Sequence, residues 1–236
     1  RQLDGAAHAE VELSVPDLEN FLDQLAVNRP PRATRPVLGD VGASIVADLR
    51  GAPQGDQRLS LHARIRGHAL EVPLGSMGRL SAPEVKVDAE ASGSLSDPSF
   101  ALAVELPHAH RDGGSQDSTA WPKALNGVVV TAHGTPKTLQ LAASLSTERA
   151  QHLAMRAGLM PTPGGVHVQG FSARWVQHHQ GRPDYGIDLG FAGLDASAER
   201  LKLEGLKLES PAGSMKGQLE LGLARHSGQL RLDLDS

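Results

Sequence analysis

Leucines alternate with charged or polar residues almost without interruption from Glu199 to Ser236. Apolar residues at every second position are typical of β-strands, because successive side chains of a strand point to opposite faces of the sheet. Such strands predict an antiparallel sheet with one face in water, so the functional question is what the other face contacts. The pattern places the following leucines of this stretch on the apolar face: Leu201, Leu203, Leu219, Leu221, Leu230 and Leu232.

The same alternation recurs along most of the chain, which predicts at least ten strands. It adds Val85, Val87, Leu139 and Leu141 to the apolar face. The remaining strands are expected at residues 7–15, 43–49, 59–65, 70–74, 85–95, 100–106, 128–132, 139–145, 166–173 and 189–196. The fold class predicted from this pattern is all-β.

Two short stretches have helical spacing of their apolar residues instead. Near 16–26, Leu18, Phe21, Leu22 and Leu25 follow Pro16, which suits a first helical turn. Near 147–157, alanines and a leucine recur at similar spacing, with Gly158 as a stop signal. We therefore expect a short amphipathic helix at each place.

The composition excludes several classes of protein. The formal charge is −4 and the Lys and Arg residues are scattered, which disfavours a nucleic-acid partner. Aromatic residues make up only 3% of the chain, too few for the aromatic girdles of an outer-membrane barrel. With no cysteine, the chain has neither a disulfide framework nor a thiolate metal site.

The longest irregular stretch, residues 107–122, is polar and rich in Gly and Ser. It predicts two β modules, 1–115 with the helix near 16–26 and 116–236 with the helix near 147–157, or one continuous sheet through both. Strand patterns run close to both ends, so we expect the chain to be a piece of a longer protein.

Three strands change their apolar phase by one residue at a glycine, namely at Gly170, Gly193 and Gly205. A phase change at a glycine predicts a β-bulge, where an extra residue lets the strand bend while its apolar side chains stay on one face. Repeated bulges favour a curved sheet that forms a trough, which could hold hydrocarbon. On the pattern alone, a sandwich in which a second sheet covers the apolar face is slightly favoured over the trough.

No catalytic or metal-binding pattern is present. His108 and His110 share one face of an extended segment, and His178 and His179 are adjacent, but no third ligand follows at a recognisable spacing. No serine lies in Gly-x-Ser-x-Gly. We expect no enzymatic activity, no cofactor and no metal.

The segments GGVHVQGFSARW, RLKLEGLKLESPAGSMKGQLELGL and GQLRLDLDS resemble the repeating strands of the AsmA-like superfamily, nearest to its TamB and YdbH types. The resemblance is closest over the C-terminal third. It lies in the general residue pattern of the strands and not in a signature of particular residues. It implies a long curved antiparallel sheet that forms an open groove, in a bacterial envelope protein.

The resemblance further implies a periplasmic segment of a bridge-like protein that transfers phospholipid between the inner and outer membranes. Such proteins are anchored in the inner membrane, and an outer-membrane partner protein is expected. The apolar residues above would then contact phospholipid acyl chains. The alternative is a structural or envelope-assembly β-sandwich that carries no lipid.

Overall fold

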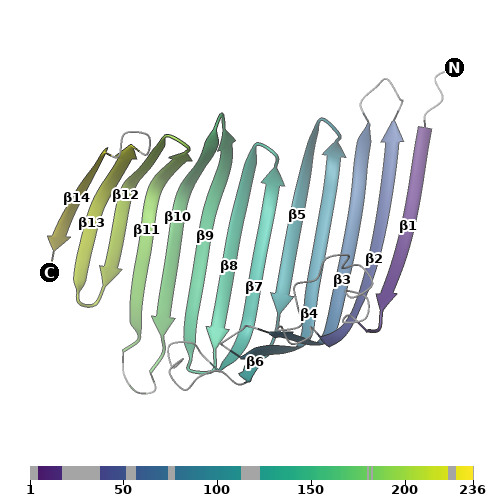
Figure 1. Cartoon of the computed structure of the whole chain (residues 1–236), viewed down its shortest axis with the longest axis horizontal. Coiled ribbons are helices and arrows are strands. Elements are labelled where there is room, and N and C mark those ends of the chain that lie inside the picture. Colours follow the sequence, from purple (N-terminus) through teal and green to yellow (C-terminus); the bar gives the residue numbers. More distant parts are fainter. Residues whose placement is uncertain are drawn as a thin grey trace, which may run out of the picture. The chain divides into compact units, whose positions relative to one another are not determined.

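The computed structural model of the chain is all-β (Figure 1). It describes residues 5–17, 38–51, 57–73, 78–112, 123–179, 181, 183–222 and 227–235. Within these ranges the chain forms fourteen strands and no helix. The prediction of an all-β chain with at least ten strands is confirmed.

The strands form one antiparallel sheet in which neighbours in sequence are also neighbours in the sheet. β6 is the exception, because it pairs with β4 and β7. The chain divides into two compact units, residues 1–130 and 131–236, and the division falls within β7. The predicted module boundary at 115 and 116 lies outside the described residues.

The first unit is a set of long strands with a bend at one end. β4 pairs with β6 through its first residues and with β5 through its later ones. Two alanines at this bend are buried, Ala82 in β4 and Ala109 in β6. The strands are β1 (Gly5–Val15), β2 (Leu38–Gly51), β3 (Arg58–Pro73), β4 (Arg79–Ser94), β5 (Asp97–Leu106), β6 (Ala109–Asp112) and β7 (Ala124–Thr135).

A bulge lies in β3 at Ala69, which has a left-handed φ of 50°. The register of β3 against β2 shifts by one residue here. The bulge faces Gly39, where a Cβ atom would lie only 2.8 Å from the carbonyl oxygen of His68. The strand expected at 70–74 is the last part of β3, which continues beyond the bulge to Pro73.

The second unit contains seven further strands in sequence order. They follow the alternating pattern, with Leu, Val or Ala on one face and mostly polar residues on the other. The strands are β8 (Thr138–Thr147), β9 (Gln151–Thr162), β10 (Gly165–Gln177), β11 (Tyr185–Ser197), β12 (Arg200–Ser210), β13 (Gly213–Gly222) and β14 (Ser227–Asp235).

The helix predicted near 147–157 is wrong, because these residues end β8, turn and begin β9. The stretch also alternates, and Leu153, Met155 and Ala157 pair with apolar residues of β8. Ala150 in the turn has a φ of 53°, which a helix does not allow. Cross-strand pairing has therefore overridden the helical spacing. Most of the helix predicted near 16–26, residues 18–26, lies outside the described part of the chain.

Several hairpin turns are closed by a Ser or Thr at the last position of a strand. In each, the side-chain oxygen accepts a hydrogen bond from the backbone N–H two residues later, an ST-turn that competes with strand continuation. The donor–acceptor distances are 3.2–3.3 Å. The residues are Ser94, Thr135, Thr147, Ser197 and Ser210.

Two of the three predicted bulges are confirmed. The register of β10 against β9 shifts by one residue at Gly170, whose φ is 60°. The register of β12 against β13 shifts likewise at Gly205, whose φ is 63°. Both glycines have the left-handed conformation that a side chain would disfavour.

The bulge predicted at Gly193 is wrong. Its φ lies outside the left-handed region, and β11 keeps its register against β10 and β12 across this residue. β10, β11 and β12 each have one residue more than the outer strands at this level. β11 therefore stays in register with both β10 and β12. Ala192 lies against the bulge of β12, since a Cβ atom on Gly205 would come within 2.9 Å of the Ala192 Cβ.

Candidate functional site

The apolar face of the second unit is its most extensive chemical feature. Residues that face each other in antiparallel strands lie on the same face, so the registers define rows of side chains across the sheet. One row crosses all seven strands, from β8 to β14: Leu139, Leu159, Val168, Leu194, Leu203, Leu219 and Leu230. Every position in this row is aliphatic.

A second row on the same face lies beyond the two bulges and also crosses the seven strands. Its members are Ala143, Met155, Ala173, Leu189, Leu208, Met215 and Leu234. The middle strands carry one more residue than the outer ones between the two rows. The bulges thus keep the apolar residues of all seven strands on one face.

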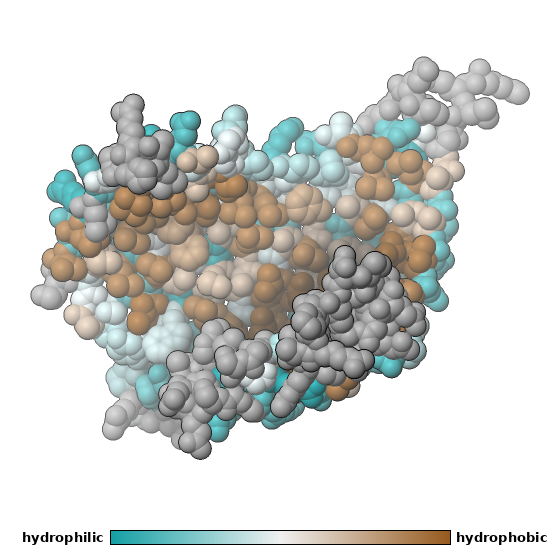
Figure 2. All heavy atoms as spheres, viewed as in Figure 1, coloured by the Kyte–Doolittle hydropathy of each residue, from teal (hydrophilic) through white to brown (hydrophobic). Residues whose placement is uncertain are grey.

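This face is open within the described part of the chain. Among the described residues of the second unit no large apolar side chain is buried, and Leu189 and Leu232 are 37% and 45% exposed. Figure 2 shows apolar side chains gathered over the strands of this unit, with hydrophilic ones at the strand ends above them. Exposed apolar surface of this continuity marks an interaction site in soluble proteins.

The β10–β11 hairpin adds aromatic rings to the same face, which the alternation pattern did not reveal. Phe171 and Phe191 stack with their ring centroids 4.7 Å apart. Trp175 and Tyr185 contact edge to face at 5.9 Å. These pairs give the middle of the face a rigid apolar surface. The available sequence signal was a phenylalanine near each phase change, with Phe171 directly after Gly170 and Phe191 two residues before Gly193.

Glycines on this face let neighbouring leucines lie close to the sheet. A Cβ atom on Gly217 would come within 2.6 Å of a Leu232 methyl carbon, and one on Gly228 within 2.5 Å of a Leu221 methyl carbon. The leucine side chains therefore occupy the space above the glycines.

The sequence-predicted residues fall into two groups. Eight of them, in β8, β12, β13 and β14, share the apolar face of the second unit: Leu139, Leu141, Leu201, Leu203, Leu219, Leu221, Leu230 and Leu232. Val85 and Val87 lie in β4 of the first unit. Val87 belongs to an apolar row there, formed with Leu13, Ala43, Ile65 and Val104.

The opposite face carries ion pairs between neighbouring strands or along one strand. In the first unit, Arg66 donates to both carboxylate oxygens of Asp88, at 3.2 and 3.1 Å. In the second unit, Lys207 contacts Glu209 at 2.6 Å. These pairs are partly exposed, as in a wetted sheet face.

Two of the four histidines singled out in the sequence take part in carboxylate pairs. His110 lies 3.0 Å from Asp112, and His178 lies 2.9 Å from Asp184. Among the described residues, no three His, Asp or Glu side chains gather as metal ligands. The described residues of the apolar face offer mainly aliphatic and aromatic side chains, which can contact apolar groups.

Comparisons with protein-family models, with curated proteins and with solved structures found no match. Within the described ranges, no helix has the length and hydropathy needed to cross a membrane.

Proposed function

We propose that the apolar face binds the acyl chains of phospholipids, and that the chain is a periplasmic segment of an AsmA-like lipid-transfer protein. In this proposal the bulges curve the sheet into an open groove, and the whole protein is anchored in the inner membrane and bridges towards an outer-membrane partner. The observation that carries the proposal is the aliphatic row from Leu139 to Leu230, which crosses seven strands in register.

Magnitudes support an acyl chain as the ligand. Each buried methylene contributes about 0.8 kcal/mol, so a chain of ordinary length gains on the order of 10 kcal/mol before ordering costs. A continuous aliphatic surface is sufficient for such binding. Weak selectivity among head groups follows, because the apolar face offers no convergent polar cluster.

Photo-crosslinking in cells tests the proposal. A photo-reactive amino acid at Leu141 or Leu221 should capture phospholipid, because both lie on the apolar face of the second unit. The same amino acid at Gln140 or Glu220, one residue away on the opposite face, should not. Substitution Leu221→Asp should block lipid passage in a folded protein.

Equal capture from both faces would contradict the proposal, as would the absence of lipid at Leu141 and Leu221 in a folded protein. Crosslinks from these two positions to protein instead of lipid would favour the alternative, a structural β-sandwich or envelope-assembly module whose apolar face is covered by a second sheet.

A further inference from the structure

The apolar face of the second unit differs between its two ends. Near the turns that join β9 to β10 and β11 to β12, the face stays apolar as far as the strands extend. The register places one row there that crosses β9 to β14 and has no hydrogen-bonding side chain: Pro161, Val166, Ala196, Leu201, Leu221 and Gly228. Val166, which follows the turn into β10, is 42% exposed. Within the described strands, the apolar face therefore has no polar border at this end.

The other end of the face has a border of hydrogen-bonding side chains on β8 to β11. It lies one step beyond an apolar row whose members are Leu145, Leu153, Trp175 and Ile187. Each residue of the border is two positions from the member of that row on its own strand, so it lies on the same face. We call this set the polar border, and its members are Thr147, Gln151, Gln177 and Tyr185.

The polar border has hydrogen-bond donors to offer a ligand. The Thr147 hydroxyl donates to the side-chain oxygen of Gln151 at 3.3 Å, so the side-chain nitrogen of Gln151 keeps its N–H groups for another acceptor. Among the described residues, no hydrogen bond involves the side-chain amide of Gln177, the Tyr185 hydroxyl or the Trp175 indole N–H. These donors are uncharged and lie in a row, so they can hold oxygen atoms without selecting the charge of the group.

Trp175 and Tyr185 lie where the polar border meets the apolar rows. Their rings contact edge to face with centroids 5.9 Å apart, and Tyr185 is 39% exposed. Each side chain combines an apolar ring with a polar N–H or O–H, which suits a boundary between an apolar phase and water. From Leu153 to Pro161, β9 continues the apolar face for roughly 26 Å at the rise of a strand. This length exceeds the roughly 15 Å of hydrocarbon in one half of a bilayer.

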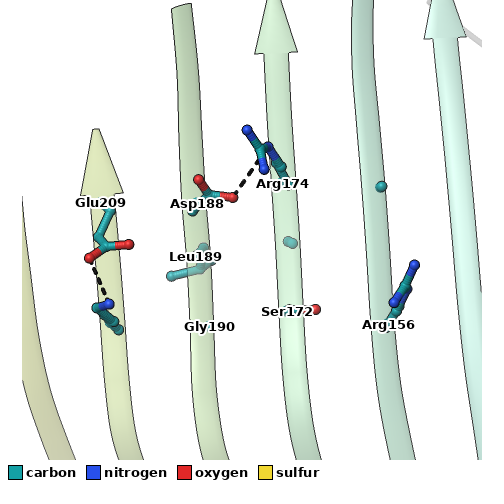
Figure 3. Close-up of a pocket in the computed structure, with 10 residues that line it drawn as sticks. Arg156, Ser172, Arg174, Asp188, Leu189, Gly190 and Glu209 are labelled. Carbon is teal, nitrogen blue, oxygen red and sulfur yellow. Dashed lines mark ion pairs between the residues drawn. The ribbon is translucent and has the colours of Figure 1, made fainter. Parts of the chain in front are cut away.

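The opposite face of the same strands carries charge pairs. Figure 3 shows Arg174 of β10 beside Asp188 of β11, with an oxygen of Asp188 3.7 Å from the Arg174 Nε. It also shows the carboxylate of Glu209, which contacts Lys207 along β12 at 2.6 Å. These charges are met by neighbouring charges of the protein, whereas the donors of the polar border have aliphatic rows beside them.

We propose that the polar border fixes the direction of a bound phospholipid. The ester and phosphate oxygens of the lipid lie at Gln177 and Tyr185, and its acyl chains point along the strands towards Pro161 and Val166. The inference rests on the proposed function, because it concerns how the same face holds acyl chains. Since the border is uncharged, it sets the direction of the lipid and leaves selectivity among head groups weak.

Hydrogen bonding gives the two directions different free energies. In the proposed direction, the side chains of the polar border donate to lipid oxygens that would otherwise bind water. In the reverse direction, hydrocarbon covers Gln177 and Tyr185, and burial of polar groups without a hydrogen bond is costly. The lipid oxygens would then lie beside the row from Pro161 to Gly228, whose side chains offer no donor.

Fluorescence quenching tests the direction. Trp121 and Trp175 are the two tryptophans of the chain, so Trp121→Phe leaves Trp175 as the single indole fluorophore. This protein is incubated with phosphatidylcholine vesicles and then separated from them, with any bound lipid, by gel filtration. The phosphatidylcholine carries a nitroxide quencher either near the carboxyl end or near the methyl end of one acyl chain. The quencher near the carboxyl end should quench Trp175 more strongly, because that end of the chain lies beside the polar border.

The lipid content of the eluted protein separates failure of the inference from failure of the proposed function. If lipid co-elutes but the two quenchers act equally, the methyl-end quencher acts more strongly, or neither acts, the proposed direction is overturned and the proposed function stands. If no lipid co-elutes with the folded protein, the proposed function fails and the inference fails with it.

Gln177→Leu in the same single-tryptophan protein measures the contribution of the polar border. Loss of one neutral hydrogen bond should lower the preference for the proposed direction by about five-fold. Gln169→Leu is the matched control, because Gln169 is also in β10 but follows Val168 of the aliphatic row and so lies on the opposite face. It should leave the ratio of the two quenching signals unchanged. A ratio that Gln177→Leu leaves unchanged, or that Gln169→Leu lowers as much, would contradict the role of the polar border.

Discussion

The two units use the same alternating strands but differ in what they bury. The first unit has three buried apolar side chains, Val15, Ala82 and Ala109, which are 6%, 5% and 3% exposed. The described part of the second unit buries no apolar side chain of comparable size, although its leucines are more numerous. The first unit thus has a few buried apolar positions, in β1, β4 and β6, that the described part of the second unit lacks. The stability of the second unit depends on hydrogen bonds between strands and on contacts between neighbouring side chains.

The two units also differ in which residue type adopts the left-handed conformation at a bulge. In the first unit the left-handed position of β3 is held by Ala69, and the facing residue Gly39 supplies the space. In the second unit Gly170 and Gly205 are themselves left-handed. A non-glycine residue such as Ala69 can therefore adopt the left-handed conformation of a bulge when the facing residue is a glycine that leaves room for it.

The largest effect on stability should come from the core of the first unit. Ala82 is 5% exposed, so Ala82→Asn places a larger, polar side chain in a nearly closed site. We expect the free energy of unfolding to fall by about 2–4 kcal/mol, from overpacking and an unpaired polar group. Ala101→Asn, at an exposed position of β5, should change it by less than about 0.5 kcal/mol. Urea denaturation measures both, and equal midpoints would show that the site of Ala82 is no more tightly packed than an exposed position of the same unit.

The next effect should come from the bulge of β12. Gly205→Ala forces a side chain into a left-handed conformation and against Ala192, which should cost about 1–3 kcal/mol. Gly193→Ala should cost less, because its φ is ordinary and the nearest atom, a ring carbon of His167, would be 3.4 Å from the new Cβ. Chemical denaturation of the two variants should rank them in this order. The reverse order would show that the bulge lies elsewhere.

A smaller effect is expected from the ion pairs of the polar face. Asp88→Asn removes the carboxylate that accepts from Arg66, which is 35% exposed. The loss should be about 0.2–1 kcal/mol and should shrink as salt is added, because exposed pairs are screened. Thermal unfolding at low and high salt provides the measurement. A loss that salt does not change would mean that the pair acts through packing.

Much of this architecture is predictable from the sequence because alternation is a local signal. Predicting the apolar row from Leu139 to Leu230 required only the alternation within each strand and the assumption that strands adjacent in sequence pair with each other. The helix expected near 147–157 failed because Leu153 and Ala157 fit both periods, and only pairing with β8 decides between them. The absence of a register shift at Gly193 could not be predicted, because a shift depends on both strands of a pair. β10 and β12 each carry the same extra residue as β11, and the sequence of β11 alone does not reveal this.

The rows of the polar face could not be predicted for a related reason. Arg156, Ser172 and Lys207 are ordinary polar positions in their own strands, and only the register brings them into one line. The Ser and Thr residues that close the turns, by contrast, are a local feature of the sequence. Ser197 and Ser210 each end an alternating run, which is a usable signal for where a strand stops.

The sequential order of the strands also determines how the second unit can open and form. Each strand there pairs only with those next to it in sequence, so the contacts are local and each hairpin closes a short loop. Such a sheet behaves as a one-dimensional array, in which stability is a sum of nearest-neighbour terms and not the property of a single core. It can form one hairpin at a time as the chain is synthesised. Separation of β14 breaks its pairing with β13 alone, whereas release of β11 breaks two sets of hydrogen bonds, so local opening is graded along the chain.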